Sequence, residues 1–341
     1  MMSPLIEALA ILGTGRDLSA EQAGAAVGAI MAGTESEAAT AAFLAVLRVK
    51  GETAEELAGA VRAVRDRMTV LEDPLPATLD TCGTGGDGAR TVNVSTATAI
   101  LAAACGVPVA KHGNRSSSGN SGSAEVLAEL GVAAEAEPPV VRRCLIELGI
   151  TFLFAPRFHP ALRFAAPARR QLPFRTLFNL VGPLANPARP AYQLVGVPNE
   201  AQAELLAHAL AGLGLRRAAV VTGGDGLDEV TLGGPTRVRL IERGEVRLET
   251  WEPPDFGLPD APSDALRVAG PAESARCLRR LLDGEKGPVR NVVLANTAAA
   301  LRVADRVGSL REGVALAAEA LDSGAAARLL DRWIELSRSA P

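Results

Sequence analysis

The sequence contains little cysteine, and its few cysteines are widely spaced. Four occur in 341 residues, at Cys82, Cys105, Cys144 and Cys277. Zinc sites and disulfide-stabilised secreted domains instead place cysteines at close, repeated spacings. We therefore expect reduced and mostly buried thiols in a cytoplasmic protein, with no fold that depends on disulfide bonds.

Long hydrophobic runs and an excess of basic charge are also missing. The longest uncharged run, Thr91–Ala110, is interrupted by hydroxyl side chains, Gly106 and Pro108, so it is too polar and broken to span a bilayer. The N-terminus lacks the charged and apolar regions of a secretory signal. A formal net charge of −4 and an isoelectric point of about 5.6 disfavour a nucleic-acid-binding protein. We expect no membrane and no nucleic-acid partner, whereas a small anionic substrate needs only a local basic pocket.

The length suits two domains, and the first is predicted to be helical. Residues 1–73 contain apolar positions at helical spacing, with glycines where helices would end, at Gly33 and Gly51. A capping box pairs a hydroxyl side chain with a Glu or Gln three residues later at a helix start. This pattern predicts helix starts at Ser19/Gln22, Thr34/Glu37 and Thr53/Glu56.

From residue 74 to 341 the pattern changes to short apolar strands that alternate with helices. Such alternation is typical of an α/β domain with a central, mostly parallel sheet. A hairpin is predicted over Arg237–Trp251, and helix starts at Ser309 and Ser323. The expected strands are Thr78–Cys82, Val107–Ala110, Thr151–Ala155, Tyr192–Val197 and Ala218–Thr222, and the expected helices include Thr96–Cys105, Ala124–Leu130, Val140–Leu148 and His159–Leu172.

A glycine-rich segment, Cys82–Gly88, directly follows the first expected strand. Three of its glycines satisfy the dinucleotide pattern G-x-G-x-x-G, but no helix opens inside the loop and no acidic residue follows about 20 positions later. Glycines do allow backbone N–H groups to converge on an anion, because no Cβ intervenes. The segment therefore indicates an anion site, with an ordinary glycine turn as the alternative.

Two further segments supply polar donors after strands. Asn93–Thr96 lies at a predicted helix start, where N–H groups favour phosphate, although Ser95 or Thr96 could be a simple helix cap. Lys111–Gly119 combines two cationic side chains, an amide and several hydroxyls, and Ser121 or Ser123 would open the next helix. Together these segments predict a second anion site at the carboxyl edge of the sheet.

These segments resemble the signature sequences of the anthranilate phosphoribosyltransferase family of tryptophan biosynthesis, which belongs to the nucleoside-phosphorylase-like phosphoribosyltransferases. The likeness covers nearly the whole chain, and the motif set is highly specific. Val92 stands where the family is expected to have an aromatic residue, and Glu125 where it is expected to have aspartate. The matching segments are 83–87, 93–96, 111–115, 152–156, 158–161, 175–187, 226–229 and the helices from Asn291 onward.

The resemblance implies transfer of a phosphoribosyl group from 5-phosphoribosyl 1-diphosphate to anthranilate, with release of pyrophosphate. It also implies a homodimer formed through the helical domains, part of residues 158–190 joining the helical domain, and an active site in the cleft. Anthranilate would contact Gly83, Asn114 and Arg169, and two Mg²⁺ ions per monomer would be held by Ser95, Asp228 and Glu229. The donor would be bound by Gly83, Gly86, Asp87, Thr91, Asn93, Val94, Ser95, Thr96, Lys111, His112, Gly113, Asn114, Arg115, Ser116, Ser117, Ser118, Gly119 and Ser123.

The chemistry of these residue types agrees with the implied reaction. Asp228 and Glu229 follow a strand through a glycine turn, and hard oxygen ligands suit Mg²⁺ on a diphosphate, although such residues are often merely solvated. Loss of pyrophosphate builds negative charge on the leaving group, which Lys111 would stabilise electrostatically. An aromatic amine is already unprotonated near neutrality, so we assign no general base. His112 is either a base or a structural hydrogen-bonding residue.

Four arginines lie in or near the helix predicted over His159–Leu172. Arg163, Arg169, Arg170 and Arg175 would mostly form a solvated face, with one guanidinium turned inward to bind the anthranilate carboxylate. Only the resemblance selects Arg169. His159 and His208 are interpreted as structural.

Two other functions stay open at this point. A pyrimidine-nucleoside phosphorylase would share the fold class and chemistry, but Asn114 and Arg115 after Lys111-His112-Gly113 argue against it. A non-catalytic relative that binds nucleic acid would need a basic groove, which the overall charge does not indicate.

Overall fold

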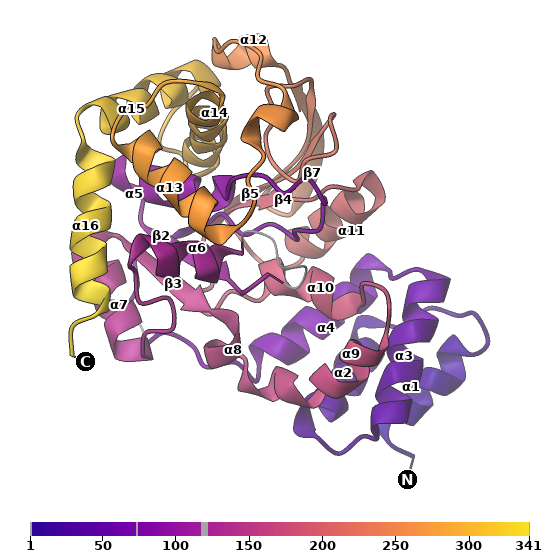
Figure 1. Ribbon diagram of the computed structural model, residues 1–341. Helices are drawn as coiled ribbons and strands as arrows, with labels where there is room; N and C mark the ends of the chain where they lie inside the picture. The colour runs from indigo at the N-terminus through magenta and orange to yellow at the C-terminus, as the bar shows by residue number, and fades with distance from the viewer. Residues whose placement is uncertain (1, 73, 117–121, 341) are drawn as a thin grey trace.

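The computed structural model describes residues 2–72, 74–116 and 122–340. A bundle of N-terminal helices lies beside a larger part built around one sheet, and the C-terminal helix runs along the far side of that part (Figure 1). The expected fold class, a helical N-terminal domain with a larger α/β domain, is confirmed. In the described part of the chain, no helix is long and apolar enough to cross a membrane.

The N-terminal bundle consists of α1 (Pro4–Leu12), α2 (Ala20–Ala32), α3 (Glu37–Lys50) and α4 (Ala54–Arg65). The capping boxes at Ser19/Gln22 and Thr53/Glu56 are both formed. The one predicted at Thr34/Glu37 is wrong, because Ser36 caps α3 and its side chain accepts from the Ala39 N–H. Gly33 ends α2 in the left-handed conformation, with φ 75°, which a residue with a Cβ rarely adopts.

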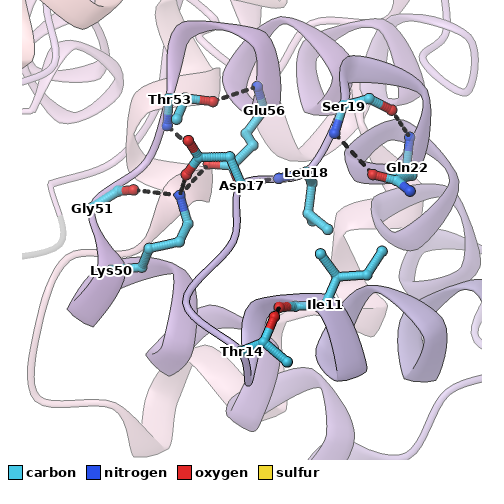
Figure 2. A network of polar contacts seen from close by, with 10 residues as sticks. All are labelled: Ile11, Thr14, Asp17, Leu18, Ser19, Gln22, Lys50, Gly51, Thr53 and Glu56. Atoms are coloured by element: carbon cyan, nitrogen blue, oxygen red, sulfur yellow. Dashed lines mark hydrogen bonds and ion pairs between the residues drawn. The ribbon is translucent and has the colours of Figure 1, made fainter.

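Glu56 ties the loops of this bundle together (Figure 2). Its side chain is fully buried, and its carboxylate accepts from the Leu18 N–H at 2.9 Å and the Thr53 N–H at 2.8 Å. The Lys50 ammonium completes the set at 3.1 Å from Oε2. One carboxylate therefore joins the α1–α2 loop to the α3–α4 loop.

The sheet has seven strands in the order β3-β2-β1-β4-β5-β6-β7. The five strands from β3 to β5 are parallel, while β6 and β7 form an antiparallel hairpin, as predicted, that turns at Arg243–Gly244. Their bounds are β1 (Leu79–Asp80), β2 (Val109–Gly113), β3 (Ile150–Phe154), β4 (Tyr192–Gly196), β5 (Arg217–Gly223), β6 (Thr236–Glu242) and β7 (Glu245–Trp251).

Side chains of the central strands alternate between two cores. Leu194 and Ala219 face one core, whereas Val195 and Ala218 face the other, as the two-residue period of a strand requires. The first core packs under α5 (Val94–Ala104), α6 (Ser123–Leu130), α13 (Pro271–Leu282), α14 (Pro288–Val303), α15 (Leu310–Asp322) and α16 (Ala325–Ser337). The second joins α11 (Glu200–Ala211) to the N-terminal bundle. A third, smaller core lies under α7 (Pro138–Leu148).

The chain between β3 and β4 consists of short helices rather than the single helix predicted over His159–Leu172. Pro156, Pro160 and Pro167 all stand at helix starts; Pro160 and Pro167 each break the preceding helix because proline lacks an N–H, whereas Pro156 follows β3. The pieces are α8 (Ala155–Phe158), η1 (Pro160–Phe164), α9 (Ala166–Gln171), α10 (Leu177–Val181) and η2 (Gly182–Leu184). The buried side chains of α10 belong to the same core as α1–α4.

The structure also decides the predicted starts of three further helices, α5, α6 and α16. Asn93 caps α5 by accepting from the Thr96 N–H at 3.0 Å, so neither Ser95 nor Thr96 is the cap. α6 begins at Ser123, one of the two expected starts, with Gly122 in the cap position, whereas α16 begins at Ala325 with Gly324 as its cap, so the start predicted at Ser323 is wrong. Ser121 lies outside the described residues. Two short helices, α12 (Pro253–Phe256) and η3 (Ser263–Leu266), complete the fold.

Candidate active site

The strand order reverses direction at β1, and the candidate site lies at this point. Chain connections run from β1 outward to β2 and β3 on one side, and β4 and β5 lie on the other. At such a switch point, the loops after adjacent strands separate and leave a crevice at the carboxyl edge. A cavity of about 580 Å³ lies there, lined by the loops that follow β1, β2 and β5 and by residues of α4 and α10. The site is thus in the cleft between the helical and the α/β parts, as expected.

The glycine loop after β1 is held by an arginine from the opposite side of the cleft. Arg175, just before α10, donates to the carbonyls of Gly85 at 2.5 Å and Thr84 at 2.6 Å. A Cβ built on Gly86 would lie 1.7 Å from Arg175 Nη1 and would displace the guanidinium, and the φ of 88° also favours glycine. On the other side of the loop, the Gly85 N–H donates to Asp228. The peptide group between residues 84 and 85 is therefore fixed at both ends.

Lys111, on β2, is buried beneath the N-terminus of α5. Its ammonium donates to the Thr81 carbonyl and the Ser95 hydroxyl, each at 3.1 Å, and the side chain is 2% exposed. It has no carboxylate within ion-pair distance among the described residues, yet its charge partly offsets the rise that burial causes in the pKa of Asp80 and Glu229. Lys111 is thus a fixed positive charge close to the acidic residues of the site.

The acidic residues of the β5–β6 loop converge on the same place. Burial, then the charge and hydrogen bond of Asp87, raise the pKa of Asp228 to about 7. Burial, followed by the charge of Asp228, raises the pKa of Glu229 well above its usual value, while the Ser95 backbone N–H stabilises its carboxylate. Three carboxyl groups therefore crowd together with too little positive charge to compensate them.

Two histidines form the inner wall of the cavity. Their rings lie 5.1 Å apart, and His112 Nδ1 is 3.0 Å from the Gly182 carbonyl, to which it donates. Burial lowers the pKa of His112 to about 3 and that of His159 to about 4, so both rings are neutral near pH 7. His112 Nε2 is then an acceptor with no hydrogen-bond partner in the described part of the chain. Nδ1 is thus committed to the backbone, and the two interpretations of His112, as a base or as a structural residue, both stay predictions.

Buried Asp80, on β1, connects β2 to the segment that follows α10. Its carboxylate accepts from the His112 N–H at 3.1 Å and from Asn186 Nδ2 at 2.8 Å. Burial raises its pKa to about 6, against the opposing charge of Lys111. Asp80 thereby fixes β2 and the 182–190 segment relative to β1.

The structure brings nearly all of the predicted site residues together. Among the described ones, only Thr96 does not line the cavity: it lies in the first turn of α5 and is fully buried. Ser117, Ser118 and Gly119 lie outside the described residues. The residues that line the cavity are Gly83, Gly86, Asp87, Thr91, Asn93, Val94, Ser95, Lys111, His112, Gly113, Asn114, Arg115, Ser116, Ser123, Arg169, Asp228 and Glu229.

The two neighbouring arginines of α9 point in different directions. Arg169 lines the cavity, with its guanidinium 5.5 Å from the centre of the Phe178 ring, and burial lowers its pKa. Arg170 is exposed and does not line the cavity. Sequence reasoning missed the roles of Arg175, His159 and Phe178 at this wall; the only sequence signal for them was their place inside the matched family segments.

The acidic pair fits a divalent cation that also binds a substrate. In residues 2–72, 74–116 and 122–340, no group of three or more His, Cys, Asp or Glu side chains could hold a metal ion alone. Mg²⁺ commonly takes one or two carboxylates and completes its octahedron with phosphate oxygens and water. The uncompensated carboxyls of Asp228 and Glu229, beside the Ser95 hydroxyl, provide such a partial set.

Comparisons with known proteins agree with this geometry. Residues 75–327 match the family described as "Glycosyl transferase family, a/b domain", and residues 6–68 match "Glycosyl transferase family, helical bundle domain". The anthranilate phosphoribosyltransferase of Thermomicrobium roseum is 51% identical over 95% of this chain and 94% of its own, and that of Rhodospirillum rubrum is 49% identical over 96% and 94%.

Solved structures show the same likeness. Anthranilate phosphoribosyltransferase from Thermus thermophilus superposes with a TM-score of 0.92 at 42% identity, covering 99% of this chain and 100% of that one. The Saccharomyces cerevisiae enzyme, in complex with PRPP and Mg, gives 0.91 at 29% identity over 100% and 99%. The chain belongs to the glycosyl transferase family that includes the anthranilate phosphoribosyltransferases.

Proposed function

We propose that this protein transfers the phosphoribosyl group of 5-phosphoribosyl 1-diphosphate to the amine of anthranilate in tryptophan biosynthesis. Pyrophosphate leaves, and N-(5-phosphoribosyl)anthranilate forms. One observation carries the proposal: the glycine loop, the N-terminus of α5, Lys111 and the acidic pair Asp228–Glu229 meet in one cavity. Relatives up to 51% identical over nearly the whole chain are anthranilate phosphoribosyltransferases.

The donor would lie along the switch-point edge. Backbone N–H groups of the glycine loop and of the α5 N-terminus would bind its phosphates, because helix N-termini and glycine turns present unpaired donors to anions. The segment from Lys111 to Gly119 and the Ser123 hydroxyl would contribute further donors. Lys111 is already desolvated and fixed, so its charge would stabilise the departing diphosphate without reorganisation.

Magnesium is the expected cofactor, with two ions per monomer as the finer proposal. A Saccharomyces cerevisiae relative has been solved with PRPP and Mg. Ser95, Asp228 and Glu229 would hold the ion, which when bound would neutralise the diphosphate charge. The protein's part is to keep the two carboxylates adjacent; burial raises the pKa of both, and a neighbouring carboxylate, Asp87 for Asp228 and Asp228 for Glu229, raises it further.

Anthranilate would bind on the side of the cavity formed by α9 and α10. Arg169 is the only α9 arginine that lines the described cavity, and its fork of N–H donors suits a carboxylate. Gly83 and Asn114 lie on the same cavity wall as the donor site and would contact the acceptor as well. The aromatic amine needs orientation rather than prior deprotonation, so positioning by these groups is the main requirement.

Assembly, domain boundaries and location belong to the same proposal. We place the helical domain at residues 1–73, joined by part of 158–190, and the α/β domain at 74–341. The shared core of α10 with α1–α4 supports the joining of part of 158–190 to the helical domain. A cytoplasmic homodimer, with contacts through the helical domains, completes it.

Steady-state kinetics of four variants test these roles. Asp228→Asn and Glu229→Gln should each reduce Mg²⁺-dependent turnover at least 100-fold while the circular dichroism spectrum stays unchanged; unchanged turnover would remove them from the metal site. Arg169→Ala should raise the KM for anthranilate with little effect on that for the donor. Arg170→Ala is the matched control, because Arg170 is exposed and outside the cavity.

A further inference from the structure

The loop that carries the acidic pair is tied down at its ends by its own residues. Gly224 donates to the Pro235 carbonyl at 2.7 Å, and Thr231 Oγ1 donates to Asp225 Oδ2 at 2.6 Å. These bonds close the loop on itself between β5 and β6. They do not connect it to the rest of the domain.

Backbone bonds such as that from the Ala261 N–H to the Leu232 carbonyl, at 3.0 Å, do so, and next to the acidic pair a side chain distant in sequence adds a further connection. Asn296, in the middle of α14, is fully buried; its Oδ1 accepts from the Val230 N–H at 2.9 Å, and its Nδ2 donates to the Val230 carbonyl at 2.8 Å. A third bond, from Nδ2 to the Val292 carbonyl at 2.9 Å, fixes the amide to its own helix. Both backbone groups of Val230, the residue directly after Glu229, are thus satisfied by one amide.

Only an amide side chain can satisfy this arrangement at this length. It must accept from one backbone group and donate to two others, and Asn combines an acceptor oxygen with two N–H donors. A hydrophobic residue would suit a buried helix interior better, because Asn is a weaker helix former than Ala or Leu. The loop, rather than the packing of α14, therefore explains an asparagine at this position.

We infer that Asn296 is a positioning residue for the acidic pair: it anchors the backbone next to Glu229 so that the carboxyl groups of Asp228 and Glu229 stay side by side at the cavity. The inference rests on the proposed metal role of those two residues. Like charges at close range repel, so an untethered loop would move its carboxylates apart. The anchor opposes that movement, and a displacement of about 1 Å in a metal or phosphate site is enough to reduce function strongly.

Thr297 provides a matched control one residue away. It is equally buried on the same helix, but within the described part of the chain its hydroxyl bonds only to the Val293 carbonyl of α14, at 2.7 Å. Removing that hydroxyl perturbs the same helix and leaves the acidic loop's hydrogen bonds intact. A role of Asn296 in general stability alone predicts similar behaviour of the two variants.

The test compares Asn296→Ala with Thr297→Ala, and uses Asn296→Ser should the alanine variant fail to fold. The half-saturating Mg²⁺ concentration is measured in turnover, and binding of phosphoribosyl diphosphate is measured by calorimetry at fixed Mg²⁺. We expect both the half-saturating Mg²⁺ concentration and the donor Kd to rise at least tenfold for Asn296→Ala or Asn296→Ser. The KM for anthranilate should change less than twofold, and Thr297→Ala should behave as the parent.

Asp228→Asn, measured in parallel, separates the two ways of failing. If it raises the half-saturating Mg²⁺ concentration while the Asn296 variants match Thr297→Ala, the anchor has no positioning role and the inference is overturned. If Asp228→Asn leaves the Mg²⁺ dependence unchanged, the proposed metal role itself is wrong.

Discussion

The contact between Arg175 and the glycine loop predicts strong coupling between two substitutions. Arg175→Ala removes two hydrogen bonds from a charged donor to the Thr84 and Gly85 carbonyls. At about 1.5 kcal/mol each, their loss would destabilise the ordered loop by about 3 kcal/mol. If the donor binds only the ordered loop, kcat/KM for phosphoribosyl diphosphate should fall about 150-fold, since 1.4 kcal/mol corresponds to tenfold.

Gly86→Ala should act largely through the same contact. Its new Cβ would lie 1.7 Å from Arg175 Nη1, so the guanidinium must leave, and φ 88° adds about 1–2 kcal/mol of backbone strain. The single variant should therefore lose about 4–5 kcal/mol of transition-state stabilisation, as measured by kcat/KM.

The double variant distinguishes this account from two independent effects. In the Arg175→Ala background, Gly86→Ala should add only the backbone strain, so the double variant loses about 4–5 kcal/mol rather than the additive 7–8. The measurement is kcat/KM for the donor in all four proteins, with melting temperatures as a control for folding. An additive double variant would refute the role assigned to Arg175.

Three further predictions concern stability and geometry. Glu56→Gln should lower the free energy of unfolding, measured by urea titration, by about 3 kcal/mol, because it breaks a buried ion pair with Lys50 and sets an amide against the Thr53 N–H. The control, Glu55→Gln at an exposed position, should stay within about 0.5 kcal/mol of the parent, and equal effects of the two variants would contradict the role of Glu56 in joining the two loops. His112 and His159 stay neutral in the folded protein, so their contribution to the free energy of unfolding is complete above pH 6.5 and falls as the pH decreases, by about 2 kcal/mol each at pH 5. His112→Gln should therefore reduce the loss of stability between pH 7 and pH 5 by about 2 kcal/mol. An unchanged loss would show that His112 becomes protonated in the folded protein. Gly196→Ala should abolish Mg²⁺-dependent turnover, since its Cβ would lie 1.6 Å from the Asp228 carbonyl oxygen, and parental turnover would mean that β4 does not constrain this loop.

Features with a local cause could be predicted from the sequence. The capping boxes at Ser19 and Thr53 and the Arg243–Gly244 turn depend on residues within a few positions of one another, and all three are formed. The alternation of strands and helices predicted the parallel sheet, because crossover connections require it. The glycine loop and the Lys111 segment were found because each directly follows a strand.

Features with a tertiary cause could not be predicted in this way. Arg175 was grouped with solvated arginines, and only the fold brings it to carbonyls 90 residues earlier. His159 reaches the cavity wall because prolines break the expected helix around it. Thr34 was assigned as a helix cap because two hydroxyl residues, Thr34 and Ser36, precede Glu37, and sequence spacing alone favoured the wrong one.

The most direct test of the proposed function is the fluorescence of anthranilate in the presence of the purified protein, Mg²⁺ and phosphoribosyl diphosphate. The account predicts a fluorescence decay that requires all three components and stops when Mg²⁺ is chelated. No decay with folded protein and fresh donor, or a decay that persists without the donor, would contradict it.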